Sequence, residues 1–292
     1  MKYKDGEYQL FLNEIGHWIK IEGSSNKTVP LVILHGGPGG NHYVFERTAG
    51  PMLAKERTVI YYEQRGCGRS DTPHSEDYSV ELLVNDFSFL VEQLGIKRVD
   101  VLGYSFGGEL ALEVALAFPG IINKIVLSAP SLMFSDMVYD IQIQGFKKIS
   151  DEEFSDRIEK LLSQNLTFKE IWQKVWALAD SELVDRFLFE DVKLAKYNRR
   201  LWENSGLSNT GKMMKALQGN PPSTPLEKRL NRIMHPTLIL TGAHDRNTGL
   251  KISNIMKQEL PNSKLEIFKK SAHFPDIEEE SKFVAKTLQF LR

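Results

Sequence analysis

The stretch KRVDVLGYSFGG, residues 97–108, decides the fold of this 292-residue chain. Residues 97–102 carry apolar and β-branched side chains at Val99, Val101 and Leu102 and predict a strand, whereas residues 108–118 have helical composition and stop at Pro119. Ser105 therefore lies in a sharp strand-to-helix turn, in which Gly103 and Gly107 leave the room that the turn demands. Such a turn exposes a serine hydroxyl at the end of the strand, and it predicts a serine nucleophile.

A serine nucleophile needs a base, and the base needs an orienting acid, because the hydroxyl is almost wholly protonated at neutral pH. In this architecture the acid and then the histidine follow the serine along the chain. Asp245 ends the strand-like segment 237–245, and His273 follows the strand-like segment 264–269. Both lie just past strand ends, where α/β sheets gather their reactive groups. We therefore predict that Ser105, Asp245 and His273 are catalytic.

Two alternatives remain open for these assignments. His244 competes with His273 as the base, although its position next to Asp245 in the sequence favours a side chain that points elsewhere. Asp245 is also a typical turn-forming residue ahead of Arg246 and Asn247.

A second glycine-rich turn, HGGPGG at residues 35–40, follows the apolar strand-like segment 31–34. Glycines let the backbone approach a substrate closely and leave its N–H groups free. The N–H of Gly37 and that of Phe106, directly after the nucleophile, are our candidates for an oxyanion hole. A phosphate-binding loop is the alternative, but neither of the usual phosphate-loop patterns occurs here.

These segments resemble the α/β-hydrolase fold and, within it, the prolyl aminopeptidase (proline iminopeptidase) family of serine peptidases. The resemblance rests on HGGPG at 35–39, EQRGCGRS at 63–70 and GYSFGG at 103–108, and it extends from about Leu31 to the C-terminus. It implies a mostly parallel sheet covered by helices on both faces. It also implies an acyl-enzyme mechanism that releases an N-terminal residue from small peptides or amides, with no metal and no cofactor.

The chain departs from that family where a free amine would be recognised. Arg246 follows Asp245 where the family has an acid, and Gly206 stands where a second acid is expected, with Glu203 displaced beside Trp202. Glu203 is then our first choice to bind an amine. The departures keep two other functions open, namely an esterase, lactonase or amidase for a small uncharged apolar substrate, and a non-catalytic ligand-binding module.

Residues 131–227 carry almost no strand signal and predict a helical cap inserted into a core made of residues 1–130 and 228–292. SDEE at 150–153 and TFKE at 167–170 are capping-box patterns that start helices, and NPPSTP at 220–225 is typical of a return linker. The cap would roof Ser105. From it we name Trp202, Met213 and Glu203 as candidate substrate contacts, together with Tyr104 of the core.

Composition limits the remaining possibilities. The net charge of −1 gives no sign of binding to nucleic acid or to an anionic membrane, so we expect a small molecule or short peptide as the substrate and neither of those partners. The single cysteine, Cys67, excludes an internal disulfide and is expected to fill space in a tight turn. No apolar run approaches the roughly 20 residues of a membrane span, and no signal-peptide pattern occurs at the N-terminus, so a cytoplasmic location is expected. The sequence leaves the oligomeric state open.

Overall fold

The computed structural model describes residues 4–73, 77–207 and 211–292 and contains one eight-stranded sheet in the order β1-β2-β4-β3-β5-β6-β7-β8. The strands are β1 (Gly6–Leu12), β2 (Ile15–Glu22), β3 (Leu31–Leu34), β4 (Val59–Tyr62), β5 (Val99–Tyr104), β6 (Ile122–Ser128), β7 (Thr237–Gly242) and β8 (Ser263–Phe268). β1 and β2 form an antiparallel hairpin, and β2 pairs antiparallel with β4. The other six strands, β3 to β8, run parallel to one another. This confirms the predicted mostly parallel α/β sheet.

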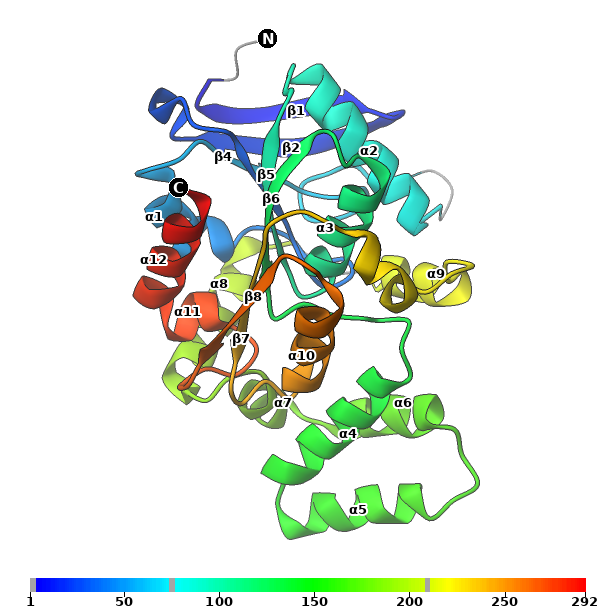
Figure 1. Cartoon of the computed structure of the whole chain (residues 1–292). Helices are drawn as coiled ribbons and strands as arrows, with labels where there is room; N and C mark the ends of the chain where they lie inside the picture. Colours follow the sequence, from blue (N-terminus) through cyan, green and yellow to red (C-terminus); the bar gives the residue numbers. More distant parts are fainter. Residues whose placement is uncertain (1–3, 74–76, 208–210) are drawn as a thin grey trace.

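Helices cover both faces of the sheet (Figure 1). On one face lie α1 (Ala49–Ala54), α11 (Pro275–Glu278) and α12 (Glu280–Leu291), and on the other lie α2 (Val80–Gln93), α3 (Phe106–Ala117) and α10 (Gly249–Glu259). Because both faces are covered, β3 and β4 are buried along their whole length, as their uniformly apolar sequences require.

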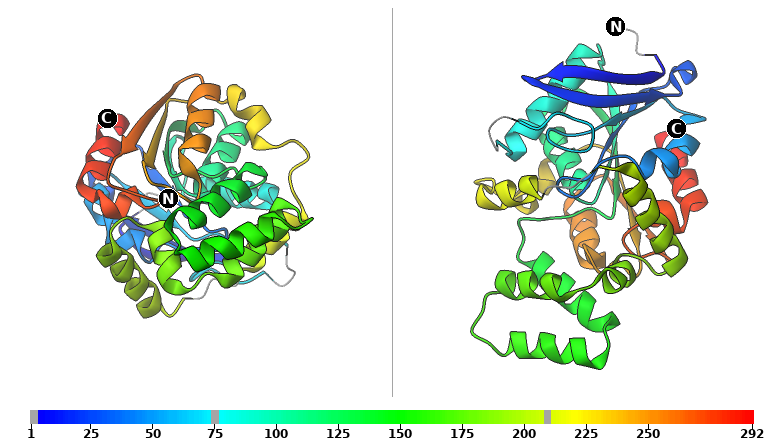
Figure 2. Two further views of the ribbon diagram at one scale, coloured as in Figure 1. Left: turned by 90° about the horizontal axis from the view of Figure 1, so that it is seen from below. Right: turned by 180° about the vertical axis from the view of Figure 1, so that it is seen from behind.

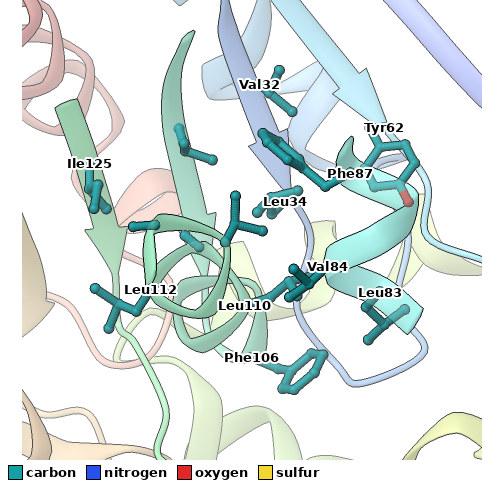
Figure 3. Packing of buried hydrophobic residues seen from close by; sticks show 14 of the residues in the cluster. Val32, Leu34, Tyr62, Leu83, Val84, Phe87, Phe106, Leu110, Leu112 and Ile125 are labelled. Atoms are coloured by element: carbon teal, nitrogen blue, oxygen red, sulfur yellow. The ribbon is translucent and has the colours of Figure 1, made fainter. Parts of the chain in front are cut away.

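The core beneath the predicted nucleophile is built from β3, α2 and α3. Figure 3 shows Val32 and Leu34 of β3 beside Phe87 of α2 and Leu110 of α3, and each of these side chains is at most 1% exposed. Phe106, the residue after Ser105, belongs to the same apolar cluster. Close packing of this kind transmits strain and holds the start of α3 in one place.

The inserted helical segment lies between β6 and β7 in the chain, and its first three helices lie below the sheet in Figure 1 and in the right view of Figure 2. Its helices are α4 (Met137–Ile149), α5 (Glu152–Leu162), α6 (Phe168–Leu178), α7 (Ser181–Leu188), α8 (Val192–Ser205) and α9 (Lys212–Gly219). The first four share an apolar cluster of their own, centred on Phe146 and Phe187, whose rings stack with centroids 4.1 Å apart. α9 differs, because its Met213 and Leu217 are buried in the cluster of the sheet domain.

The two predicted capping boxes have different outcomes. Thr167 and Glu170 form both halves of a capping box at the start of α6, as predicted. The prediction for Ser150 is wrong, because α5 is capped by Asp151, whose carboxylate accepts from the N–H of Phe154 at 2.9 Å. Ser150 instead ends α4, where its backbone N–H donates to the carbonyl of Phe146.

Three short 3₁₀ helices, η1 (Ser24–Asn26), η2 (Phe45–Arg47) and η3 (Leu226–Arg232), complete the described elements. η3 follows residues 220–225, which form no helix or strand, in agreement with the predicted linker. Within the described residues, every helix is too short or too polar to cross a membrane.

Candidate active site

Ser105 occupies the turn between β5 and α3 with φ 53° and ψ −124°, a backbone conformation that is strained for a residue with a side chain. The turn is held from both sides by close backbone contacts. A Cβ atom at Gly103 would lie 2.1 Å from the carbonyl oxygen of Gly107, and one at Gly107 would lie 2.1 Å from that of Leu34. Both glycines are therefore required for steric reasons, as predicted for a tight elbow.

Asp245 and His273 come together at the ends of β7 and β8. The Nδ1 atom of His273 lies 3.2 Å from both carboxylate oxygens of Asp245, and both side chains are almost completely buried. Thr248, which no sequence pattern singled out, donates its hydroxyl to Asp245 Oδ2 at 2.7 Å. Burial alone would raise the pKa of Asp245, but His273, Thr248 and the N–H of Asn247 outweigh it and lower that pKa, so the group is a carboxylate.

The outer nitrogen of His273 has a partner that sequence reasoning missed. Its Nε2 atom lies 3.0 Å from the side-chain amide nitrogen of Asn247. Within the described part of the chain, the Ser105 hydroxyl makes no hydrogen bond to His273 or to another side chain. Ser105 and His273 nevertheless line the same cavity.

The predicted oxyanion-hole residues border Ser105. Gly37 lines the main cavity, and Gly37 and Phe106 together line a smaller adjoining pocket of about 60 Å³ that also contacts Ser105. Phe106 is the first residue of α3, a position whose N–H has no partner inside the helix. The loop that carries Gly37 approaches so closely that a Cβ atom at Gly36 would lie 2.9 Å from the Cβ of Ser105.

The main cavity has a volume of about 890 Å³ and is lined by loops of the sheet domain and by residues of the inserted segment. A cavity of this size accommodates a small organic substrate. Most of its wall is apolar or aromatic and includes Val44, Phe45, Trp172, Trp176, Val184, Leu188, Phe189, Trp202, Met214, Phe274 and Ile277.

The four predicted substrate contacts divide evenly. Trp202 and Tyr104 line the cavity, and Tyr104 also donates its hydroxyl to the carbonyl of Asn41 at 2.9 Å. The predictions for Met213 and Glu203 disagree with the structure. Met213 is on the side of α9 that is buried in the core cluster of the sheet domain. Its neighbour Met214 lines the cavity instead, because successive helical residues face different sides. Glu203 is exposed and lies outside the cavity wall.

Two buried carboxylates line the cavity, and neither was selected from the sequence. Asp185 is paired with Arg199, which also lines the cavity, at 2.6 Å. Asp276, three residues after His273, is only 5% exposed, and within the described chain no other residue donates a hydrogen bond to its side chain. Burial raises the pKa of Asp276 to about 7.

Other charged residues near the site point away from it. Arg246, whose charge was expected beside the substrate, pairs with Glu190 and donates to the carbonyl of Arg186 instead. The ring of His244 faces the carbonyl of Lys269, so His244 does not compete with His273 for Asp245. Cys67 is buried, which raises the pKa of its thiol and leaves it a poor nucleophile.

The sequence of this chain is similar to a protein family and to several characterised proteins. Residues 29–280 match a family model described as alpha/beta hydrolase fold. A proline iminopeptidase from Heyndrickxia coagulans is 28% identical over 265 residues, which cover 90% of this chain and 90% of that protein. A 2-hydroxy-6-oxononadienedioate/2-hydroxy-6-oxononatrienedioate hydrolase from Paraburkholderia xenovorans is 27% identical and covers 100% of this chain and 93% of its own length.

Solved structures resemble the chain over nearly its whole length. A proline iminopeptidase-related protein from Thermus thermophilus has a TM-score of 0.81 at 22% identity, covering 99% of this chain and 98% of that one. A meta-cleavage product hydrolase from Pseudomonas fluorescens has a TM-score of 0.71 at 19% identity, covering 97% and 96%. At these identities the likeness establishes the fold and leaves the substrate open.

Proposed function

The chain belongs to the alpha/beta hydrolase fold family, and from that premise we propose that it is a serine hydrolase that works through an acyl-enzyme, with Ser105 as nucleophile. The observation that carries the proposal is the arrangement of Ser105 on a strained turn, beside a His273 that is itself oriented by a buried Asp245. Nucleophile, base and orienting acid lie on three loops that follow β5, β8 and β7. This is the constellation that activates a serine.

The reaction proceeds in two halves. His273 takes the proton of Ser105 while Oγ attacks a substrate carbonyl, and Asp245 holds the proton on Nδ1 and stabilises the imidazolium. The N–H groups of Gly37 and Phe106 stabilise the tetrahedral oxyanion. His273 then protonates the leaving amine or alcohol, and water repeats the sequence on the acyl-enzyme to release the acid.

For the substrate, we propose an N-terminal residue with a free amine, released from a small peptide or amide. Asp276 supports this proposal, because an unpaired buried carboxylate in a cavity gains most from a cationic partner. It would take the role that was expected of Glu203. The pairing of Arg246 with Glu190 supports it as well, since the charge expected to repel an amine is neutralised outside the cavity.

A specific observation also favours the second candidate, an esterase, lactonase or amidase for uncharged apolar substrates. Trp172, Trp176 and Trp202 all belong to the wall contributed by the inserted helices. A substrate with an uncharged ring would bury its apolar surface against such a wall.

A paired rate assay separates the two candidates. Proline p-nitroanilide is compared with its N-acetylated form and with p-nitrophenyl butyrate, each with the wild type and with Ser105→Ala. We expect the wild type to prefer the free amine and the variant to be inactive on all three substrates. A preference for the ester and the acetylated amide would favour the second candidate. Undiminished turnover by Ser105→Ala would exclude the proposed mechanism.

A further inference from the structure

A continuous chain of hydrogen bonds joins the inserted helices to the proposed base. The indole N–H groups of Trp172 and Trp176, both on α6, lie 2.5 and 2.8 Å from Oε1 of Gln142 on α4. The side-chain nitrogen of Gln142 lies 2.6 Å from Oδ1 of Asn247 and 3.1 Å from its carbonyl oxygen. The side-chain nitrogen of Asn247 lies 3.0 Å from Nε2 of His273. All these residues line the cavity that contains Ser105.

Chemistry fixes the direction of every bond in this chain. An indole nitrogen only donates, so the two tryptophans require Gln142 to present its oxygen to them and its NH₂ group to Asn247. Asn247 must then accept with its oxygen and turn its own NH₂ group toward His273. At the far end the Asp245 carboxylate only accepts, so His273 carries its proton on Nδ1 and accepts on Nε2.

The consequence concerns the lone pair on which the reaction depends. A neutral imidazole has one in-plane lone pair, and in His273 the amide of Asn247 occupies it. Ser105 must donate its hydroxyl proton to the same lone pair before it can attack a carbonyl. Asn247 and Ser105 therefore compete for one acceptor.

We infer that Asn247 masks the base in the empty enzyme, that Gln142, Trp172 and Trp176 hold the mask in place, and that a substrate bound beneath the inserted helices releases it. The inference rests on the proposed roles of Ser105 and His273. A substrate that fills the cavity lies against Gln142 and the two indoles and competes for their hydrogen bonds. Once the hydrogen bond from Gln142 to Asn247 is broken, the Asn247 side chain is free to rotate away from Nε2 of His273. His273 then accepts a hydrogen bond from Ser105. Asn247 is thus a positioning residue through which substrate binding and activation of the nucleophile are coupled.

The test is the rate at which a small dialkyl fluorophosphonate labels Ser105, since such a probe does not need the inserted helices for its recognition. We expect Asn247→Ala to be labelled about 2- to 10-fold faster than the wild type, the range that corresponds to one neutral hydrogen bond. The backbone N–H of Asn247, which donates to Asp245 at 2.9 Å, is unaffected by this change. Gln142→Leu should accelerate labelling in the same direction but less.

Coupling between the two positions gives a readout that a merely structural role would not produce. If Gln142 acts through Asn247, the double variant is labelled no faster than Asn247→Ala alone. Gln144→Leu is the matched control, since Gln144 lies on the same helix but is exposed and outside the cavity. It should behave like the wild type.

Three results would count against this inference, and they are distinguishable. Labelling of Asn247→Ala at or below the wild-type rate, with normal thermal unfolding, overturns the masking role alone. Should Asn247→Ala fail to fold, an unchanged rate in Gln142→Leu overturns it in the same way. Absence of labelling at Ser105 in the wild type overturns the proposed function itself, and the masking role with it.

Discussion

Helix α3 of the sheet domain and four helices of the inserted segment, α5 to α8, begin in opposite ways. Helices α5 to α8 each begin with an Asp or Thr whose side chain accepts from a backbone N–H of the first turn. Helix α3 begins at Phe106, its N-cap residue Ser105 provides no side-chain cap, and the N–H of Phe106 remains available. A capped terminus stabilises a helix by about 1 kcal/mol. The start of α3 forgoes that stabilisation and presents donors and a hydroxyl to a cavity.

The same contrast extends to the cavity as a whole. The sheet domain supplies buried, hydrogen-bonded groups on loops fixed by parallel strands, whereas the inserted helices supply a wall that includes three tryptophans. The arrangement indicates a division in which the loops set the reaction and the wall selects the substrate. Asp276 and Asn247 are exceptions to this division, because both belong to the sheet domain. Asp276 is proposed to recognise the substrate, and Asn247 is proposed to couple substrate binding to the reaction.

The largest effect should come from Ser105→Ala. We expect kcat/KM to fall by about 10⁴-fold or more on every substrate, because the nucleophile is lost whatever the wall selects. Thermal unfolding should be unchanged, since the removed hydroxyl makes no hydrogen bond within the described structure. A fall confined to one substrate class would break the proposed division.

Asp276→Asn should abolish selection for a free amine while sparing the chemistry. We expect the preference for proline p-nitroanilide over its acetylated form to fall about 10- to 100-fold, the worth of a hydrogen bond to a charged group. Hydrolysis of p-nitrophenyl butyrate should change little. Glu203→Gln is the matched control, because Glu203 is an exposed carboxylate that lies off the cavity wall, and it should leave the preference intact.

The same carboxylate predicts a pH dependence of substrate binding. The pKa of Asp276 is raised to about 7, so the group is neutral below that pH and charged above it. KM for the free amine should therefore fall between about pH 6 and 7.5, a range in which an α-amino group remains mostly protonated. The acetylated substrate should show no such fall, and neither substrate should show it in Asp276→Asn. A parallel fall for both substrates would assign it to another group.

Trp202→Ala tests the wall of the inserted helices. Removal of this indole from the cavity should raise KM for p-nitrophenyl butyrate about 10-fold, because the acyl chain loses apolar contact, and should leave kcat nearly unchanged. Trp202→Phe keeps most of the apolar surface, so its KM should lie between that of the wild type and that of Trp202→Ala. An equal loss of kcat in Trp202→Ala would mean that the wall also positions reacting groups.

Thr248→Val should give the smallest effect, and in contrast to Trp202→Ala it should change kcat rather than KM. It removes the hydroxyl that donates to Asp245 at 2.7 Å and keeps the side-chain shape. We expect kcat to fall about 3- to 10-fold on all three substrates alike, because a less firmly held Asp245 orients His273 less well. A change in substrate preference would contradict the assignment of Thr248 to the reaction side.

Most of the fold and half of the site could be predicted because they depend on local patterns. The apolar run of β3, the glycines around Ser105 and the order of Ser105, Asp245 and His273 can be recognised from neighbours in sequence. The errors arose where the choice between adjacent residues mattered. Met213 and Met214 are equally apolar, and only the orientation of α9 against the core decides which of them faces the cavity.

What the sequence by itself determined is the set of groups near the strand ends, because parallel strands bring their carboxyl ends to one edge whatever the details of packing. What only the tertiary structure decided is which distant side chains meet there. Gln142 reaches Asn247 across 105 positions of the chain, and Arg246 turns to Glu190 across 56. Hydrogen bonds of this kind depend on distances of a few tenths of an ångström. No local periodicity encodes them, so they follow only once the helices have packed.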